Sequence, residues 1–226
     1  MLLSSMTYTI VKEVILNGNI LFFFQTLLNF SQYPQIFLEA GLKDTKYVTQ
    51  ENNTAGFFVN PYKNHYFFYE ILFSSSKADK NNSNYTISWN LKENTQENYI
   101  HKIPELSLSN KNTFLYKNKS IDLEPKKKFF LRNTGSWTLT PLKENTFKAT
   151  YSVEFIFNLE AFPFSGTKIG KFFISNILKA RVEKIKNSEL DKVIKQLLKT
   201  SEKKSSAPSQ PSISPSEKKS LSSSSL

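Results

Sequence analysis

The 226-residue chain contains no cysteine, only two histidines and only six glycines. Without cysteine it has no disulfide framework, no thiolate metal site and no cysteine nucleophile. His65 and His101 are too few and too isolated to form a histidine-rich metal cluster. The sequence has no glycine-rich phosphate-binding loop, and neither histidine has a serine or aspartate at the spacing of a catalytic triad. We therefore expect no metal, no cofactor and no catalytic residue.

Long hydrophobic runs are also missing. The strongest apolar run, Ile20–Phe30, covers about eleven residues with three polar interruptions. A helix that crosses a bilayer needs about twenty. The start of the chain, Met1–Ile10, has neither the basic segment nor the small-residue cleavage site of a signal peptide. We expect a cytoplasmic protein in which Ile20–Phe30 forms a buried helix.

Positive charge is in excess, with 30 Lys and Arg against 19 Asp and Glu, a net charge of +11. Such a balance can indicate a nucleic acid, an anionic membrane surface or the ribosome as partner. It is equally consistent with lysine serving as the solubilising residue of a chain rich in Asn and Lys. Residues 201–226 are nearly half serine and have almost no apolar side chains, which predicts a disordered tail. The fold is then made by residues 1–200.

Aromatic residues are abundant, at 14% of the chain. They favour sheets and the walls of apolar pockets. The clearest strand is Thr146–Leu159, where apolar and polar residues alternate and give one dry face. His65–Phe73 is apolar on both faces, which is typical of a strand between two layers. We predict further strands at Thr7–Leu16, Leu42–Gln50, Ala55–Asn60, Tyr85–Leu91 and Phe129–Pro141, and a long loop or irregular hairpin over 92–125.

Helical spacing follows the first strand at Leu21–Leu28, and Pro34 suits the first turn of a short helix that ends at Glu39. A long helix is predicted from Ser165, as its N-cap, to about Thr200. Its apolar stripe comprises Ile169, Phe172, Phe173, Asn176, Ile177 and Ala180. A dry sheet face and one long helix must pack on each other. The predicted class is therefore α+β, a helix-grip fold in which a curved antiparallel sheet of about six to seven strands wraps around a long C-terminal helix.

Three local patterns resemble the START-like superfamily, which includes lipid-transfer domains, polyketide cyclases and coenzyme-Q-binding proteins. Leu27–Phe37, with Tyr33-Pro34, is similar to the junction between the two small helices of that family. Gly135–Pro141, followed by Thr146–Tyr151, looks like its late hairpin, and Phe162-Pro163 precedes the long helix where the family commonly has a proline. The resemblance implies a cavity between the sheet and the last helix, and a hydrophobic small molecule or lipid as its occupant.

The candidate ligand-binding residues are the apolar side chains expected to face that cavity: Phe67, Tyr69, Trp89, Trp137, Tyr151, Phe155, Phe172, Phe173 and Ile177. Plain core packing is the alternative for each of them. Glu70 either orients a polar ligand group or pairs with a lysine, and Arg132 either holds an anionic head group or lies on a solvated strand edge.

Lysines decorate the last helix, and Lys179, Lys184 and Lys186 are the candidate surface-binding residues. They form a solvated face, or they dock on an anionic membrane or on the ribosome. The sequence thus leaves three functions open: a non-catalytic carrier of a hydrophobic ligand, a basic interaction module that contacts membrane, RNA or ribosome, and a cyclase- or hydrolase-like enzyme that uses the same pocket. The first is favoured because no paired acid and base residues lie along the dry face.

Overall fold

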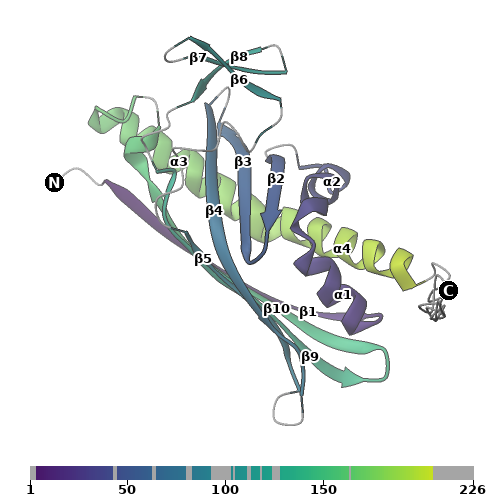
Figure 1. The fold of residues 1–226 in the computed structure, drawn as a ribbon. Coiled ribbons are helices and arrows are strands. Elements are labelled where there is room, and N and C mark those ends of the chain that lie inside the picture. The colour runs from purple at the N-terminus through teal and green to yellow at the C-terminus, as the bar shows by residue number, and fades with distance from the viewer. Residues whose placement is uncertain are drawn as a thin grey trace, which may run out of the picture.

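A curved antiparallel sheet forms the body of the molecule in the computed structural model, which describes residues 4–205 apart from 43–44, 63–64, 80–82, 93–102, 104, 111–112, 118, 124–127 and 163. Among these residues, seven strands follow one another across the sheet in the order β2, β3, β4, β5, β9, β10 and β1. Their bounds are β1 Ser5–Asn17, β2 Thr45–Glu51, β3 Thr54–Tyr62, β4 His65–Ser76, β5 Tyr85–Leu91, β9 Phe130–Lys143 and β10 Thr146–Asn158. The long C-terminal helix crosses the sheet, as Figure 1 shows, and the predicted helix-grip fold is confirmed.

Strand β10 lies between β9 and β1 and pairs with β1 along its whole length, from Thr146 opposite Asn17 to Asn158 opposite Ser5. The alternation in its sequence explains the pairing. Phe147, Ala149 and Val153 are buried on the inner face of the sheet, while the residues between them point to the other face.

Two short helices close one end of the sheet. In α1 (Ile20–Leu28), the side chain of Asn19 caps the first turn by accepting hydrogen bonds from the backbone N–H of Leu21 (2.9 Å) and of Phe22 (3.2 Å). Phe23, Phe24 and Leu27 are almost completely buried, and α1 packs against the last helix. A 3-10 turn at Phe30–Gln32 leads into α2 (Tyr33–Glu39), in which Pro34 occupies the first turn as predicted. The apolar run is therefore a buried helix.

The C-terminal helix consists of α3 (Lys168–Lys184), a π-helical turn (Ile185–Glu189) and α4 (Leu190–Ser205). Thr167 caps α3 by accepting a hydrogen bond from the backbone N–H of Gly170 (2.9 Å), so the prediction of Ser165 as the N-cap is wrong. Since α4 continues to Ser205, residues 201–205 are helical. The rest of the predicted tail, like His101, lies outside the described residues.

The inner face of α3 differs from the predicted stripe. Ile174, Leu178 and Val182 are buried, whereas Phe172 is 69% and Phe173 is 60% exposed. The prediction that Phe172 and Phe173 face the cavity is therefore wrong. The physical reason is that α3 carries two apolar stripes, one on each side of a helix with about 3.6 residues per turn, and periodicity alone does not say which one faces the sheet.

A small three-stranded sheet replaces the loop or irregular hairpin predicted for residues 92–125. It consists of β6 (Leu106–Asn110), β7 (Thr113–Tyr116) and β8 (Lys119–Leu123), and β8 joins the start of β4 in a short parallel pairing. These strands lie beside the upper end of the main sheet in Figure 1. Ile103, Leu106 and Tyr116 pack with Phe58 and Phe68 in a second apolar cluster. This cluster accounts for the two apolar faces of β4.

Candidate ligand-binding cavity

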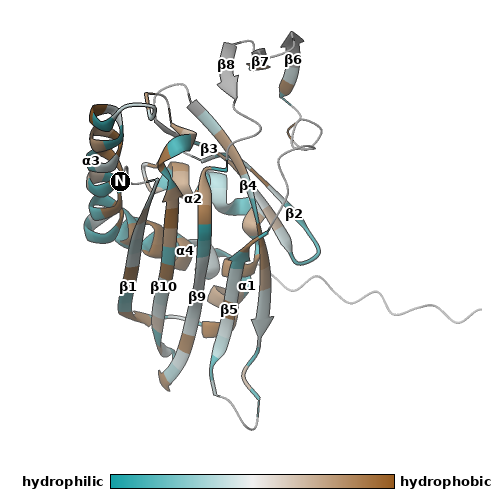
Figure 2. Ribbon diagram, turned by 90° about the vertical axis from the view of Figure 1, so that its left-hand side faces the viewer, coloured by the Kyte–Doolittle hydropathy of each residue, from teal (hydrophilic) through white to brown (hydrophobic). Residues whose placement is uncertain are grey.

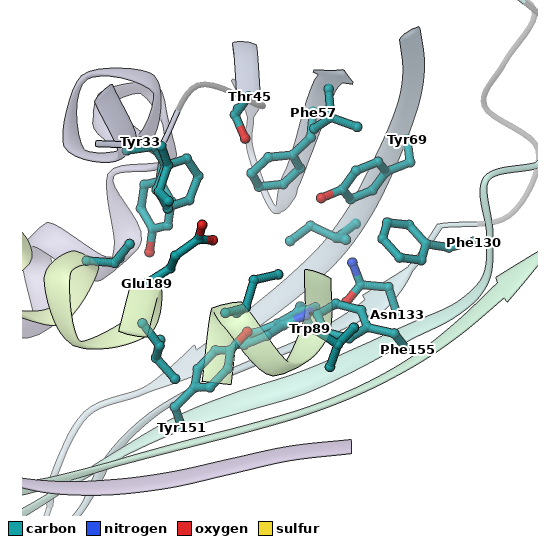
Figure 3. Close-up of a pocket in the computed structure, with 18 of the residues that line it drawn as sticks. Tyr33, Thr45, Phe57, Tyr69, Trp89, Phe130, Asn133, Tyr151, Phe155 and Glu189 are labelled. Atoms are coloured by element: carbon teal, nitrogen blue, oxygen red, sulfur yellow. Dashed lines mark hydrogen bonds between the residues drawn. The ribbon is translucent and has the colours of Figure 1, made fainter. Parts of the chain in front are cut away.

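A cavity of about 290 Å³ lies between the inner face of the sheet and the C-terminal helix. Its lining comes from α1 and α2, from strands β2 to β5, from β9 and β10, and from α3, the π-helical turn and α4. Figure 3 shows the side chains converging on this space from opposite sides. Most of them are aromatic or aliphatic, so the cavity is an apolar chamber with a few polar groups.

Aromatic rings form two stacked pairs in the lining of the cavity. Phe57 stacks on Tyr69, with ring centroids 5.2 Å apart, and Phe130 stacks on Phe155 at 5.6 Å. Tyr69 meets Phe130 edge to face at 4.9 Å, which joins the two pairs. Such ring contacts hold the walls in fixed orientations. Tyr151 and Phe155 are only half-buried because both rings border the open space.

Asn133 and Trp89 form the best-defined polar contact of the lining. The indole N–H of Trp89 donates a hydrogen bond to Oδ1 of Asn133 (3.0 Å), and both residues are buried. Since an indole nitrogen is a donor only, the amide oxygen must face it. The NH₂ group of Asn133 therefore points into the cavity, as Figure 3 shows. Gly135 makes the arrangement possible, because a Cβ there would lie 2.4 Å from the Trp89 ring.

Three tyrosine hydroxyls reach the cavity, those of Tyr33, Tyr69 and Tyr151. Burial raises the pKa of all three well above the ordinary value for tyrosine, and the negative charge that Tyr151 carries once ionised would raise the pKa of Tyr33 and Tyr69 further. Their hydroxyls therefore stay protonated and serve as hydrogen-bond groups rather than as bases. The Tyr33 hydroxyl donates to the backbone carbonyl of Leu27 (2.9 Å).

The π-helical turn carries the acidic residue of the lining. Glu189 is 4% exposed, and its carboxylate lies 2.5 Å from the Arg181 guanidinium and 3.3 Å from the Lys184 ammonium. A buried carboxylate needs such partners because the interior solvates charge poorly. Arg181 also lines the cavity. The charges on this side of the cavity neutralise one another, so the Glu189 carboxylate is not an unpaired base.

Of the nine predicted cavity residues, Tyr69, Trp89, Trp137, Tyr151 and Phe155 line the cavity. Phe67 is instead buried in the neighbouring core, where its ring stacks on Phe129 at 4.6 Å. Ile177 is half-buried and is not part of the lining. All five lining candidates lie on the sheet, whereas the helix candidates Phe172, Phe173 and Ile177 do not line the cavity.

Sequence reasoning missed Asn133, Arg181 and Glu189. A signal for Asn133 was present, because it lies an even number of residues before Trp137 and so shares its face of β9. No comparable signal marks Arg181 and Glu189. They are eight residues apart, and a regular α-helix would place them about 80° apart around its axis. The π-helical turn between them changes that angle.

The remaining charged candidates have structural partners or face solvent. Glu70, 2% exposed, pairs with Lys92 (3.4 Å), and Arg132 pairs with Glu154 on the surface (2.9 Å). Lys179 and Lys186 are exposed on the C-terminal helix, and Lys184 is too, although it also contacts Glu189. Among the described residues, no helix is both long enough and apolar enough to cross a membrane.

No protein-family model matches the chain, and no curated protein is similar to it in sequence. Among solved structures, the Zhui aromatase/cyclase from Streptomyces sp. R1128 is 11% identical over 89% of this chain and 98% of its own, with a TM-score of 0.53. Human STARD10 is 10% identical over 87% of this chain and 66% of its own, with a TM-score of 0.49. A STAR-related lipid transfer protein from Xanthomonas axonopodis is 13% identical over 83% of this chain and 84% of its own, with a TM-score of 0.48. The likeness to the aromatase/cyclase, at 11% identity, shows a shared fold.

Proposed function

We propose that the chain binds and carries one compact hydrophobic molecule in the cavity between the sheet and the C-terminal helix, without covalent chemistry. The observation that carries the proposal is the cavity itself: about 290 Å³ lined mainly by aromatic and aliphatic side chains of the hydrophobic core. Protein interiors normally leave few voids larger than a water molecule. An apolar chamber of this size therefore supports a ligand-binding role.

The size of the cavity restricts the ligand. Sites for small molecules commonly measure about 300–1,000 Å³, and this one is at the lower end. One flat ring system or one acyl chain suits such a space better than a lipid with two chains. The aromatic side chains of Phe57, Tyr69, Phe130 and Phe155 in the lining favour a planar molecule, because aromatic rings pack well on one another in stacked or edge-to-face arrangements.

The polar groups of the lining indicate how the ligand is oriented. The NH₂ group of Asn133 is a donor, and the protonated hydroxyl of Tyr69 can donate as well. Both side chains lie near Phe130 on one side of the chamber (Figure 3). A ligand with a carbonyl or hydroxyl oxygen at one end would satisfy them. We infer a mainly apolar ligand with one hydrogen-bond acceptor near Asn133.

Native mass spectrometry of the full chain, purified from its own cells, tests the proposal. We expect a stoichiometric non-covalent adduct that organic extraction releases for identification. The matched comparison is Asn133→Leu, which keeps a similar volume and removes the amide donor, and which we expect to retain less of the same molecule. A protein without any adduct, which also binds none of its own cells' extracted lipids, would falsify the carrier function.

Catalysis in the same cavity is the second candidate, and the polar groups Asn133, Tyr69 and Glu189 around one space favour it. The extracted ligand separates the two functions. A carrier returns the molecule chemically unchanged after prolonged incubation with the purified protein. An enzyme of the cyclase or hydrolase type releases a product of different mass or structure, and its rate falls in Tyr69→Phe.

The exposed Lys179, Lys184 and Lys186 favour an anionic surface as an additional partner. The notable feature of their helix is that the lysines stand beside exposed apolar side chains. Lysines beside exposed apolar side chains indicate a membrane-type surface more specifically than positive charge alone does. These side chains lie on the side of α3 that faces away from the cavity.

A further inference from the structure

The outer side of α3 and the turn before it carry four large apolar side chains that remain accessible. Ile169 is 82% exposed, Phe164 80%, Phe172 69% and Phe173 60%. We call these four residues the outer patch. Taking about 200 Å² for each side chain, they expose on the order of 500 Å² of apolar surface, as much as the largest patch of an ordinary monomer. Figure 2 shows α3 at the edge of the molecule, with hydrophobic and hydrophilic stretches side by side.

The backbone holds Phe164 outward in an unfavourable conformation. Its φ of 63° is in the left-handed region, which a bulky residue rarely adopts. The turn is built around Gly170, since a Cβ at that position would lie 1.8 Å from the Phe164 carbonyl oxygen. Thr167 fixes the same turn by capping Gly170. A strained, exposed phenylalanine that its surroundings maintain points to a function for the exposed ring.

Basic residues border the outer patch. Lys168 and Lys179 are exposed and form no ion pair among the described residues, and Lys184 is 67% exposed although it contacts Glu189. By helical geometry Lys168 and Lys179 lie on one side of the apolar stripe and Lys184 on the other. Glu183 is the acidic residue on this side of α3. The outer patch is therefore an apolar stripe between positive edges.

We propose that the outer patch docks on an anionic lipid bilayer. The four apolar side chains enter the interfacial region, while the lysines bordering them reach the lipid phosphates with their ammonium groups. The net charge of +11 attracts the whole molecule to such a surface. Phenylalanine on the apolar side and lysine at the edges is the composition that interfacial helices use.

A second copy of the chain is a less suitable occupant. A standard protein interface buries about 800 Å² on each partner, more than the outer patch exposes. A symmetric pairing through α3 would also bring Lys168, Lys179 and Lys184 of both copies together, between two chains of charge +11. An anionic bilayer removes this repulsion and matches the charge.

Docking in this orientation places α3 between the bilayer and the cavity, because Leu178 and Val182 line the cavity from the opposite side of the same helix. The proposal does not depend on the cavity holding a ligand. It rests on the exposed side chains alone, so it stands or falls separately from the carrier function.

Vesicle flotation of the full chain tests the docking, with vesicles of phosphatidylcholine alone and of equal parts phosphatidylcholine and phosphatidylserine. We expect binding to the anionic vesicles, and a partition coefficient lowered at least about tenfold in the double variant Phe172→Ser/Phe173→Ser. The matched control is Val11→Ser/Ile15→Ser, since these apolar side chains are 57% and 69% exposed and belong to β1 rather than to α3 or the turn before it. It should bind like the wild type.

Two further measurements exclude a general surface effect. Phe172→Trp should show a blue shift of tryptophan emission on anionic vesicles, since Trp89 and Trp137 are already buried, while Ile15→Trp should not. Lys168→Glu/Lys179→Glu should weaken binding and reduce its salt dependence. The docking is overturned if the wild type does not float with anionic vesicles or if the serine double variant floats equally well. It is also overturned if sedimentation shows a dimer that this variant dissociates, or if the patch binds RNA and not vesicles.

Discussion

The two faces of strand β4 lead into two apolar clusters that are packed differently. On one face, Phe68 is 2% exposed and packs with Phe58 and Tyr116 in a filled cluster beneath β6–β8. On the other face, Tyr69 and Ile71 border the cavity of about 290 Å³. The residue types are alike on both faces. The difference lies in the opposing layer, because a small sheet can settle directly on β3 and β4, whereas a rigid helix crossing a curved sheet leaves a gap.

This comparison predicts that equal truncations have unequal costs. Phe68→Ala removes a side chain that is surrounded on all sides and should lower the free energy of unfolding by about 3–5 kcal/mol. Phe155→Ala removes a ring that already borders the cavity and should cost roughly half as much in ligand-free protein. Urea unfolding of both variants measures the difference. Equal losses would mean that the cavity is filled in solution.

Enlarged side chains should show the same contrast between the cavity and the filled cluster. Val182→Phe adds a ring that the cavity can accommodate, so stability should stay within about 1 kcal/mol of the wild type while ligand binding is lost. Ile103→Phe adds the same kind of bulk to the filled cluster and should destabilise by about 1–3 kcal/mol through overpacking. Thermal unfolding with parallel ligand-binding assays separates the two. Strong destabilisation by Val182→Phe would argue against the open space.

The tyrosines of the cavity predict a pH dependence. Burial raises the pKa of Tyr69 and Tyr151 in the folded state, whereas the unfolded chain loses these protons near pH 10. Their contribution to stability is therefore complete below pH 10 and is lost as the pH rises above it. Above pH 10, each such tyrosine lowers the free energy of unfolding by about 1.4 kcal/mol for every further pH unit, up to its pKa in the folded state.

Urea midpoints measured across the alkaline range test this slope, and Tyr69→Phe should reduce it by one tyrosine's share. Absorbance of phenolate gives an independent reading, because the buried tyrosines should ionise only when the chain unfolds. A Tyr69→Phe variant with an unchanged slope would show that this hydroxyl is already accessible to solvent.

The smallest expected effect on stability is that of Tyr69→Phe at neutral pH, below about 1 kcal/mol, since the hydroxyl borders the cavity and its removal leaves the ring in place. Ligand affinity should nevertheless fall by about tenfold, the value of one hydrogen bond. Calorimetry with the identified ligand measures it, and Tyr116→Phe in the filled cluster is the control. If both variants bind alike, Tyr69 does not contact the ligand.

The sheet is predictable from the sequence because the period-two alternation in Thr146–Leu159 fixes which face of the strand is buried. The side of the long helix that faces the sheet is not predictable in this way. Its two apolar stripes, one through Phe172 and one through Ile174, satisfy the same helical periodicity, and only the tertiary fold decides between them. Likewise, the π-helical turn that brings Glu189 to Arg181 depends on packing and has no pattern of its own.

The strands within residues 92–125 are hard to predict for a different reason. Each is only four or five residues long and lies among polar stretches, so the alternation in Leu106–Asn110 is too short to identify a strand by itself. The apolar outer face of β4 was the stronger hint, because Phe68 needed a partner layer. A buried strand with two apolar faces therefore predicts a second packed layer.

Electron density in the cavity is the most direct test of the central claim that the hollow is a ligand site. A crystal structure of the protein purified from its own cells should show one compact molecule in contact with the Phe57–Tyr69 and Phe130–Phe155 ring pairs, with an oxygen within hydrogen-bonding distance of the Asn133 amide. A space that is closed by repacked side chains, or that contains only ordered water, would contradict the account.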